Sequence, residues 1–305
     1  MVTEGGTTFT YRTPLLRLTP GVHRYRISSE DETFKDSLMI REPNDKEQFI
    51  FIGDIQDQEK GKTAAFFNQI RDRFSDADAW LFAGDLIERG HHGYWEIFYD
   101  AVRDFAPHTV FLPTAGNHEY TKGLEKRLDP RWMKAFPKKE LIGGMYTYYV
   151  DYSHARFISI DTNTLPYGLP VLIRWLRKAL TDRRDAPFLI VMMHHGVKSP
   201  AKGRLNLIER LILGPILKKY GADLVLQGHD HVYARWRTKE SVPLYLTSTT
   251  SFKSYGVKST DSDITVSQDH GRFYVVLDLS EGRLSGKVYR EDHTLFDHFT
   301  KTKQP

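Results

Sequence analysis

The sequence predicts an α/β fold with a β-rich C-terminal part, and three observations support this fold class. Apolar runs of strand length recur along residues 46–236, and five of them end in a cluster of Asp, Asn or His. Amphipathic helical stretches separate most of these runs, as in the strand–helix–strand units of parallel sheets. After Pro243 the remaining segments read as consecutive antiparallel strands without helices between them.

Composition narrows the function classes. The chain has 305 residues, 40% hydrophobic and 27% charged, which is typical of an ordinary globular protein. Its net charge is only +4 and no dense Lys/Arg block occurs, so a nucleic-acid partner is not expected. No apolar run approaches the roughly 20 residues of a membrane span. No signal peptide is visible, so localisation stays open, as does the oligomeric state.

Residues 1–45 are predicted to form a short all-β segment. The stretch "LLRLTPGVHRYRIS" reads as strand, Pro-Gly turn and strand, and "DSLMIREP" adds a short strand ended by Pro43. Three short strands make an incomplete sheet. We therefore expect this segment to pack against the main domain, residues 46–305.

The main domain begins with three strands that each run into a polar turn. The runs "FIFIGD", "AWLFAGD" and "VFLPTAGNHE" are apolar without alternation, which is typical of strands buried on both faces. Helices are predicted between them at residues 62–74 and 94–105. The order strand, loop, helix is thus repeated along the first half.

The second half continues this order and then changes to antiparallel strands. Alternation over residues 145–162 predicts a hairpin that turns at residues 152–155. Helices are predicted at residues 169–182 and 207–221, the second broken near Gly214 and Pro215. The strands expected around and after them are "APFLIVMMHHG", "ADLVLQGHDH", "PLYLTSTT", "GRFYVVLDLS" and "GRLSGKVYRE".

Polar side chains follow five of these strands. They are Asp54 with Gln56 and Asp57, Asp85, Asn117 with His118, His194 with His195, and His229 with His231. Ligand sites of α/β sheets lie outside the carboxyl ends of the strands, so we expect one common site. His229 and His231, two residues apart on an extended segment, would point to the same side of it.

A metal centre explains this set. Burying several carboxylates and imidazoles without partners is costly, and divalent cations neutralise the former and accept lone pairs from the latter. The chain has no cysteine, and a mixed Asp, Asn and His set suits Fe, Mn, Zn or Co. About seven or eight ligands exceed the needs of one ion and suit two ions roughly 3.5–4 Å apart.

In order along the chain, "GDIQ", "GDLIERG", "GNHE", "VMMHHG" and "GHDH" resemble the signature blocks of the calcineurin-like metallophosphoesterase superfamily, over residues 49–236. "KYGADLVLQGHDHVYAR" and "GKVYREDHTLFDHFTKTK" are similar to its purple acid phosphatase-like branch. "LLRLTPGVHRYRI" resembles the end of the fibronectin-type domain found there. The resemblance implies a two-sheet β-sandwich flanked by helices over residues 46–305, preceded by a partial fibronectin-like segment over residues 1–45.

The resemblance also implies a role for each site residue. Asp85 would bridge two metal ions, Asp54 and His231 would hold the first ion, and Asn117, His194 and His229 would hold the second. His118 would act as general acid or hydrogen-bond donor, Glu88 would pair with it, Arg89 would grip phosphate, and His195 would lie beside the site as a substrate-binding residue.

Gln56 departs from the family pattern. Many relatives have histidine there. Purple acid phosphatases have glycine, and recruit a tyrosine three residues after the bridging aspartate, where this chain has Glu88. The iron–tyrosinate bond therefore cannot form in the family's way. Either Gln56 ligates weakly through its amide oxygen or water fills the position. Asp57 would either compensate or serve as a turn or helix-capping residue.

The resemblance implies an enzyme that hydrolyses phosphorylated small molecules by a metal-activated hydroxide. Phosphomonoesters, as for an acid phosphatase, are the expected substrates, with Fe, Mn or Zn as the ions. One alternative is a phosphodiesterase acting on nucleotides or glycerophosphodiesters. The other is a catalytically degenerate metal-binding protein in which Gln56 disables the first site.

Overall fold

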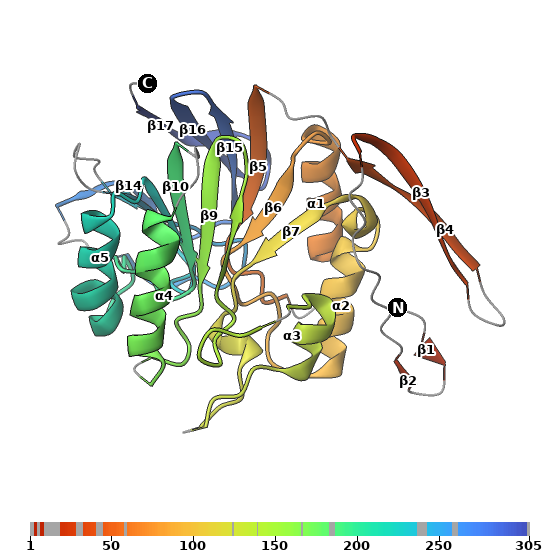
Figure 1. Cartoon of the computed structure of the whole chain (residues 1–305), viewed down its shortest axis with the longest axis horizontal. Coiled ribbons are helices and arrows are strands. Elements are labelled where there is room, and N and C mark those ends of the chain that lie inside the picture. Colours follow the sequence, from red (N-terminus) through yellow and green to blue (C-terminus); the bar gives the residue numbers. More distant parts are fainter. Residues whose placement is uncertain are drawn as a thin grey trace.

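Two β-sheets lie face to face at the centre of the protein, and helices cover the outer face of each (Figure 1). The computed structural model describes residues 3–4, 7–8, 19–28, 33–40, 45–57, 60–123, 125–138, 140–165, 167–182, 187–236, 243–257 and 262–303. The apolar core between the sheets includes Phe51, Phe157 and Leu226. The predicted α/β class and two-sheet sandwich are confirmed.

One sheet has six strands in the order β17-β16-β15-β5-β6-β7. They are β5 (Lys46–Ile52), β6 (Ala79–Phe82), β7 (Val110–Pro113), β15 (Phe273–Ser280), β16 (Arg283–Arg290) and β17 (Leu295–Thr302). The helices of this half are α1 (Lys62–Arg73), α2 (His92–Val102), α3 (Pro130–Ala135) and the short 3₁₀ turns η1 (Ala106–His108) and η2 (Asn117–Glu119). Phe49 and Phe51 face the other sheet, while Ile50 and Ile52 face the helices, so the uninterrupted apolar run is buried on both sides.

The other sheet has seven strands in the order β14-β12-β13-β11-β10-β9-β8. They are β8 (Tyr148–Asp151), β9 (Ala155–Ile160), β10 (Phe188–Met193), β11 (Leu224–Gln227), β12 (Tyr233–Trp236), β13 (Leu244–Thr247) and β14 (Ile264–Gln268). Helices α4 (Leu169–Thr181) and α5 (Gly214–Lys219), with the π-helical turn η3 (Glu209–Leu213), pack on its outer face. Among the described helices, none is long and apolar enough to span a membrane.

Most predicted elements are confirmed, with two strands missed. The helix expected at residues 207–221 is interrupted where predicted: η3 ends at Leu213 and α5 begins at Gly214, because Pro215 has no N–H to donate within a regular helix. Strand β17 pairs with β16 although its outer positions are polar and exposed. Strand β14 is short and lies at the sheet edge, and its alternation was too brief to be recognised.

The N-terminal segment contains two small antiparallel pairs. Strands β1 (Thr3–Glu4) and β2 (Thr7–Thr8) form one, and β3 (Gly21–Ser28) and β4 (Thr33–Ile40) form a hairpin beside the helical layer (Figure 1). A ring nitrogen of His108 lies 2.6 Å from the carbonyl oxygen of Ser37, which links the hairpin to η1. The strand expected at residues 15–18 lies outside the described residues. The domain boundary near residue 45 and the fibronectin-like assignment stay predictions.

The two sheets are tied together where their parallel strands end. Asp54, after β5, forms a bridge to Thr249, after β13, and its carbonyl accepts a hydrogen bond of 2.9 Å from the amide of Thr250. Close packing here requires glycine: a Cβ on Gly116 would lie 2.1 Å from Oδ1 of Asp85. The strand ends that carry the polar clusters are therefore held against each other.

Candidate metal centre

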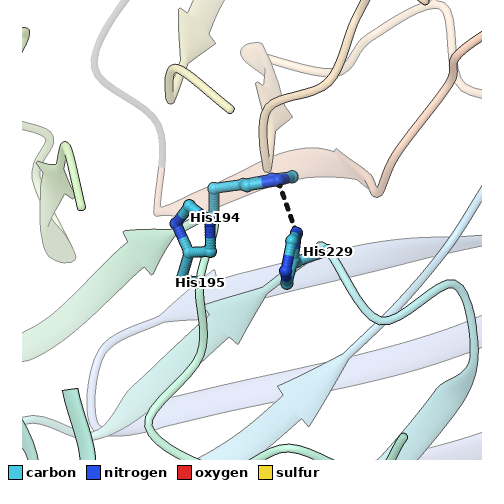
Figure 2. Close-up of side chains that lie close together, drawn as sticks. All are labelled: His194, His195 and His229. Carbon is cyan, nitrogen blue, oxygen red and sulfur yellow. Dashed lines mark hydrogen bonds between the residues drawn. The ribbon is translucent and has the colours of Figure 1, made fainter. Parts of the chain in front are cut away.

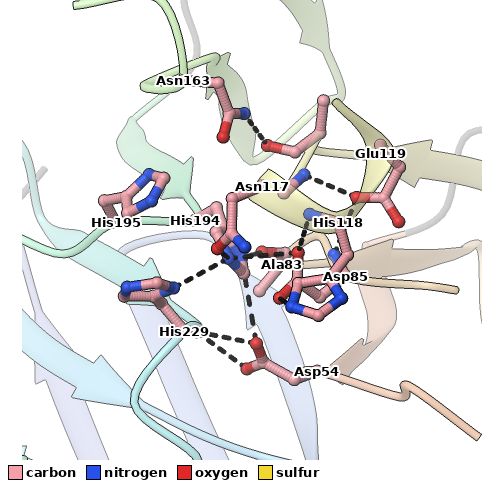
Figure 3. Close-up of polar contacts among 12 residues, drawn as sticks. Asp54, Ala83, Asp85, Asn117, His118, Glu119, Asn163, His194, His195 and His229 are labelled. Carbon is pink, nitrogen blue, oxygen red and sulfur yellow. Dashed lines mark hydrogen bonds and ion pairs between the residues drawn. The ribbon is translucent and has the colours of Figure 1, made fainter. Parts of the chain in front are cut away.

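Three predicted metal ligands converge on one atom of a fourth, Nε2 of His194 (Figure 3). Asn117 Oδ1 lies 3.0 Å from it, His229 Nδ1 3.2 Å, and Asp85 Oδ1 3.3 Å. On the other side of the ring, Nδ1 of His194 lies 2.8 Å from the carbonyl oxygen of Ala83 and donates to it. The outward nitrogen Nε2 is thereby left as the ligating atom, in the manner of metal-bound histidines.

This cluster requires a positive charge. Burial by itself lowers the pKa of His194, but the charges of Asp85 and Asp54 outweigh it and raise that pKa to about 9. A proton or a metal ion therefore balances the charge of the carboxylates beside Nε2 of His194. Ligand atoms of a tetrahedral ion with bonds of about 2.1 Å are about 3.4 Å apart, close to the spacing found here. The donor set thus fits the second metal ion.

The remaining histidines are held in the neutral form that binds metals. Burial lowers the pKa of His231 to about 4, with the charge of His194 contributing. Burial and the charge of His194 also place the pKa values of His195 and His229 well below the ordinary range. These rings therefore keep free lone pairs at neutral pH.

The residues expected to hold the first ion lie near one another; they are Asp54, Asp85, His231 and Gln56. Asp54 is fully buried, and burial together with the negative charge of Asp85 raises its pKa to about 7, against the opposing charge of His194. His231 Nε2 lies 3.8 Å from Asp54 Oδ1. Among the described residues, the buried Gln56 Oε1 has no hydrogen-bond partner, while its Nε2 donates to Asp85 Oδ2 at 3.0 Å. Rotating the amide by 180° would place an acceptor toward the first ion.

Asp57 does not join this set. Its Oδ2 accepts hydrogen bonds from the amide and the hydroxyl of Thr63, at 3.1 and 2.6 Å, in the first turn of α1. These contacts favour the helix-capping interpretation of Asp57, since they commit Oδ2 to the first turn of α1.

Backbone strain is concentrated in the predicted ligands. Gln56, Asp85, His229 and His231 all have positive φ, of 44°, 52°, 72° and 50°. Such conformations cost on the order of 1–3 kcal/mol each and cluster at functional sites. The expectation of an extended segment at His229 and His231 is therefore wrong. The chain bends at both residues after Gly228, and this bend, rather than a two-residue repeat, turns their side chains toward the site.

His118 lies beside Asp85. Its amide donates to Asp85 Oδ1 at 2.9 Å, its Nε2 lies 3.9 Å from Asp85 Oδ2, and its Nδ1 contacts the carbonyl oxygen of Glu88. The carboxylate of Glu88 instead forms an ion pair of 2.5 Å with Lys253. Glu88 therefore contacts His118 through its main-chain carbonyl oxygen, whereas its side-chain carboxylate is paired with Lys253.

Arg89 and His195 have different neighbours in the structure. Arg89 is exposed, and its guanidinium lies 5.8 Å from the ring of Tyr94 on α2. The ring of His195 lies 4.3 Å from that of His229, and its Nδ1 is 2.8 Å from the hydroxyl of Thr162. Nitrogens of His194, His195 and His229 lie within 4.8 Å of one another (Figure 2). His195 therefore borders the second metal site directly.

Two buried acids that support the site were missed in the sequence. Glu119 accepts from the amides of Gly116, Asp85 and Leu86 at 2.7, 2.9 and 2.8 Å (Figure 3). Burial and the charge of Asp85 raise its pKa to about 8, and these amides oppose that rise. The signal was its place three residues after Gly116, a capping-box spacing.

Asp161, which follows β9, is the second of these acids. It accepts from the amides of Tyr146 and Asn163 at 2.9 and 3.0 Å and from the hydroxyl of Tyr120. Asn163 in turn donates to the carbonyl oxygen of Ala115 at 2.9 Å, just before the loop that carries Asn117. No motif in the sequence marks Asp161.

Replacing Gln56 with histidine is expected to tighten binding of the more weakly held ion about tenfold or more, because imidazole is a better ligand than an amide. Calorimetric titration of Mn²⁺ or Zn²⁺ into chelator-treated protein measures this. The companion variant Gln56→Ala separates the two open readings: weaker binding shows that the amide ligates, and unchanged binding shows that water fills the position. Unchanged affinity in Gln56→His would contradict a first site at this corner.

Comparison with known proteins places this geometry in a family. The profile of the calcineurin-like phosphoesterases matches residues 48–233, close to the range of the motif resemblance. Purple acid phosphatase 21 of Arabidopsis thaliana is 27% identical over 202 residues, which is 62% of this chain and 45% of that protein. Purple acid phosphatase 4 of the same plant is 28% identical over 198 residues, 57% of each. The chain spans about half the length of these curated relatives.

Solved structures share the fold. A purple acid phosphatase, PPD1, from yellow lupin (Lupinus luteus) seeds superposes with a TM-score of 0.75 at 18% identity, covering 94% of this chain and 61% of that one. GAP50, the anchor in the inner membrane complex of Plasmodium, gives 0.64 at 19% identity, covering 85% and 90%. Because the family profile covers more than half of the chain, the protein belongs to the calcineurin-like phosphoesterases, a family of metallophosphoesterase hydrolases, and it is distantly homologous to plant purple acid phosphatases.

Proposed function

We propose that the protein is a phosphomonoesterase that depends on two metal ions. The observation that carries the proposal is the convergence of Asp85, Asn117 and His229 on Nε2 of His194, within 3.0–3.3 Å. These atoms carry lone pairs or negative charge in a buried setting, an arrangement that only a cation stabilises. The family match supports hydrolysis of a phosphoester, and the likeness to purple acid phosphatases supports a monoester substrate.

The positions of these residues support the assignment that the resemblance implies. Asn117, His194 and His229 would hold the second ion, Asp54, His231 and Gln56 the first, and Asp85 would contact both. Fe, Mn or Zn suits these nitrogen and oxygen donors. When bound, such ions activate water at neutral pH and neutralise the oxygens of the phosphoester.

His118 is placed to assist the leaving group. Its Nδ1 is engaged by the carbonyl oxygen of Glu88, so the ring is fixed and Nε2 is the atom available to substrate. The side chain is 25% exposed, and the carboxylate of Asp85 lies 3.9 Å from Nε2. From this position Nε2 can donate a hydrogen bond or a proton to the departing alkoxide oxygen.

Turnover of two model substrates tests the proposal. In manganese-loaded protein, kcat/KM for p-nitrophenyl phosphate is expected to exceed that for bis(p-nitrophenyl) phosphate about tenfold or more. The reverse preference would replace the proposal with a phosphodiesterase. Protein that holds two ions and hydrolyses neither ester would exclude both activities and favour the degenerate metal-binding protein.

A further inference from the structure

Arg204 contacts one of the expected metal ligands. Its Nη1 contacts His229 Nε2, its Nε lies 3.4 Å from Asp230 Oδ1, and its guanidinium lies 5.0 Å from the ring of Tyr255. Tyr255 also packs on His231, with the ring centroids 4.9 Å apart. The guanidinium is thus held over the two histidines of the "GHDH" bend, and its side chain is still 29% exposed.

The loops that carry these residues are joined to each other. Ala201 forms an antiparallel bridge with Val257, and the amide of Lys202 donates to the carbonyl oxygen of Gly256 at 2.9 Å. The loop that follows β10 and the loop that follows β13 therefore form one rim over the site. Arg204 enters from the first loop.

The contact between Arg204 and His229 cannot persist in the metal-bound protein. Guanidinium is only a donor, so it bonds to Nε2 of His229 when that nitrogen carries no proton. If His229 ligates through Nδ1, which faces His194, its Nε2 must carry the proton and repels the guanidinium. If it ligates through Nε2, the ion takes the place of Arg204. In both cases the guanidinium leaves His229 Nε2 but keeps Asp230 and Tyr255 beside it, and its partly exposed side chain can turn to an anionic ligand.

We propose that Arg204 binds the phosphoryl group of the substrate, the role that the family resemblance gives to Arg89, and that it makes the site selective for phosphomonoesters. This inference rests on the proposed function. Guanidinium matches two phosphate oxygens at once. A monoester presents three non-bridging oxygens and a diester only two, so a site that adds Arg204 to its metal ions discriminates against diesters.

Arg89 and Lys253 are two further cations next to residues of the expected site, and each has another contact. Arg89 is exposed, and the contact of its guanidinium is with the ring of Tyr94, 5.8 Å away. Lys253 is paired with the carboxylate of Glu88 at 2.5 Å, which offsets its charge. Arg204 alone among these three contacts a predicted metal ligand through its side chain.

The test compares Arg204→Ala with Arg89→Ala and with Lys202→Ala, a matched loss of charge in the same loop. Calorimetry measures binding of Mn²⁺ to each chelator-treated protein and then of inorganic phosphate to each manganese-loaded protein. In Arg204→Ala the dissociation constant for phosphate is expected to rise about 10- to 100-fold. Metal affinity is expected to stay equal or increase, since a competing contact is removed. Preference for p-nitrophenyl phosphate over its bis ester should fall about tenfold.

Weaker phosphate binding together with unchanged or tighter Mn²⁺ binding separates this role from a structural one. A misfolded rim would weaken the binding of both the metal ion and phosphate. Unchanged phosphate affinity in Arg204→Ala, or a loss confined to Arg89→Ala, would overturn the inference and leave the phosphomonoesterase intact. Arg204→Lys, which keeps the charge, is expected to recover part of the phosphate affinity. Wild-type protein that neither takes up two ions nor turns over the monoester would instead refute the proposed function itself.

Discussion

Replacing Asp85 with asparagine is expected to lower kcat for p-nitrophenyl phosphate on the order of 1000-fold and to weaken both metal sites. Burial opposes the charge of Asp85, but the charges of His194 and His118 and the hydrogen bond from the amide of His118 outweigh burial. They lower the pKa of Asp85 to about 2, so the carboxylate is ionised at neutral pH. Its Oδ1 lies 3.3 Å from His194 Nε2 and its Oδ2 accepts from Gln56. An amide at this position removes the one negative charge shared by both sites.

Elemental mass spectrometry and steady-state turnover measure the two effects. Asp72→Asn, an exposed carboxylate on α1, is the matched control and should retain wild-type metal content and rate. Near-normal turnover with two ions per chain in Asp85→Asn would mean that Asp85 does not bridge them.

Glu119→Ala is expected to lower the free energy of unfolding by about 3 kcal/mol or more, because it leaves buried main-chain amides without an acceptor. Its two oxygens accept from Asp85, Leu86 and Gly116 within 2.9 Å, and the side chain is fully buried. These amides belong to the two loops that present Asp85 and Asn117. Chemical denaturation of chelator-treated protein measures the change.

Glu119→Gln keeps an acceptor oxygen and the shape of the side chain, so it should be more stable to unfolding than the alanine variant. Its amide group meets main-chain N–H groups that also donate, and we expect an intermediate loss of stability with weaker metal binding. An unfolding free energy of Glu119→Ala within about 0.5 kcal/mol of wild type would show that this carboxylate does not organise the loops.

The local pattern was sufficient to bring the expected ligand residues together at one site, because each follows the end of a buried apolar strand within a few residues. Asp54 follows β5 and His194 follows β10, and both motifs are local. The run from Phe49 to Ile52 has the same logic: one face packs on the second sheet and the other on the helices. Local pattern therefore carried most of the fold class.

Contacts made between distant segments could not be read from local patterns. Glu119 accepts from Asp85 across 34 residues, and Lys253 pairs with Glu88 across 165. The left-handed conformation of His229 depends on the fold around it, so the sequence suggested an extended segment instead. Strand β17 was not predicted because it contains few apolar residues. It is held in the sheet by its antiparallel pairing with β16, which the sequence pattern does not show.

The binuclear metal centre is tested most simply by the metal content per chain, measured by elemental mass spectrometry on protein purified without chelator. The same protein is assayed for p-nitrophenyl phosphate turnover after addition of Mn, Fe, Zn or Co. We expect two ions per chain, and turnover that is lost on chelation and restored by adding metal. One ion or none, with no turnover under any of these metals, would contradict a binuclear phosphoesterase.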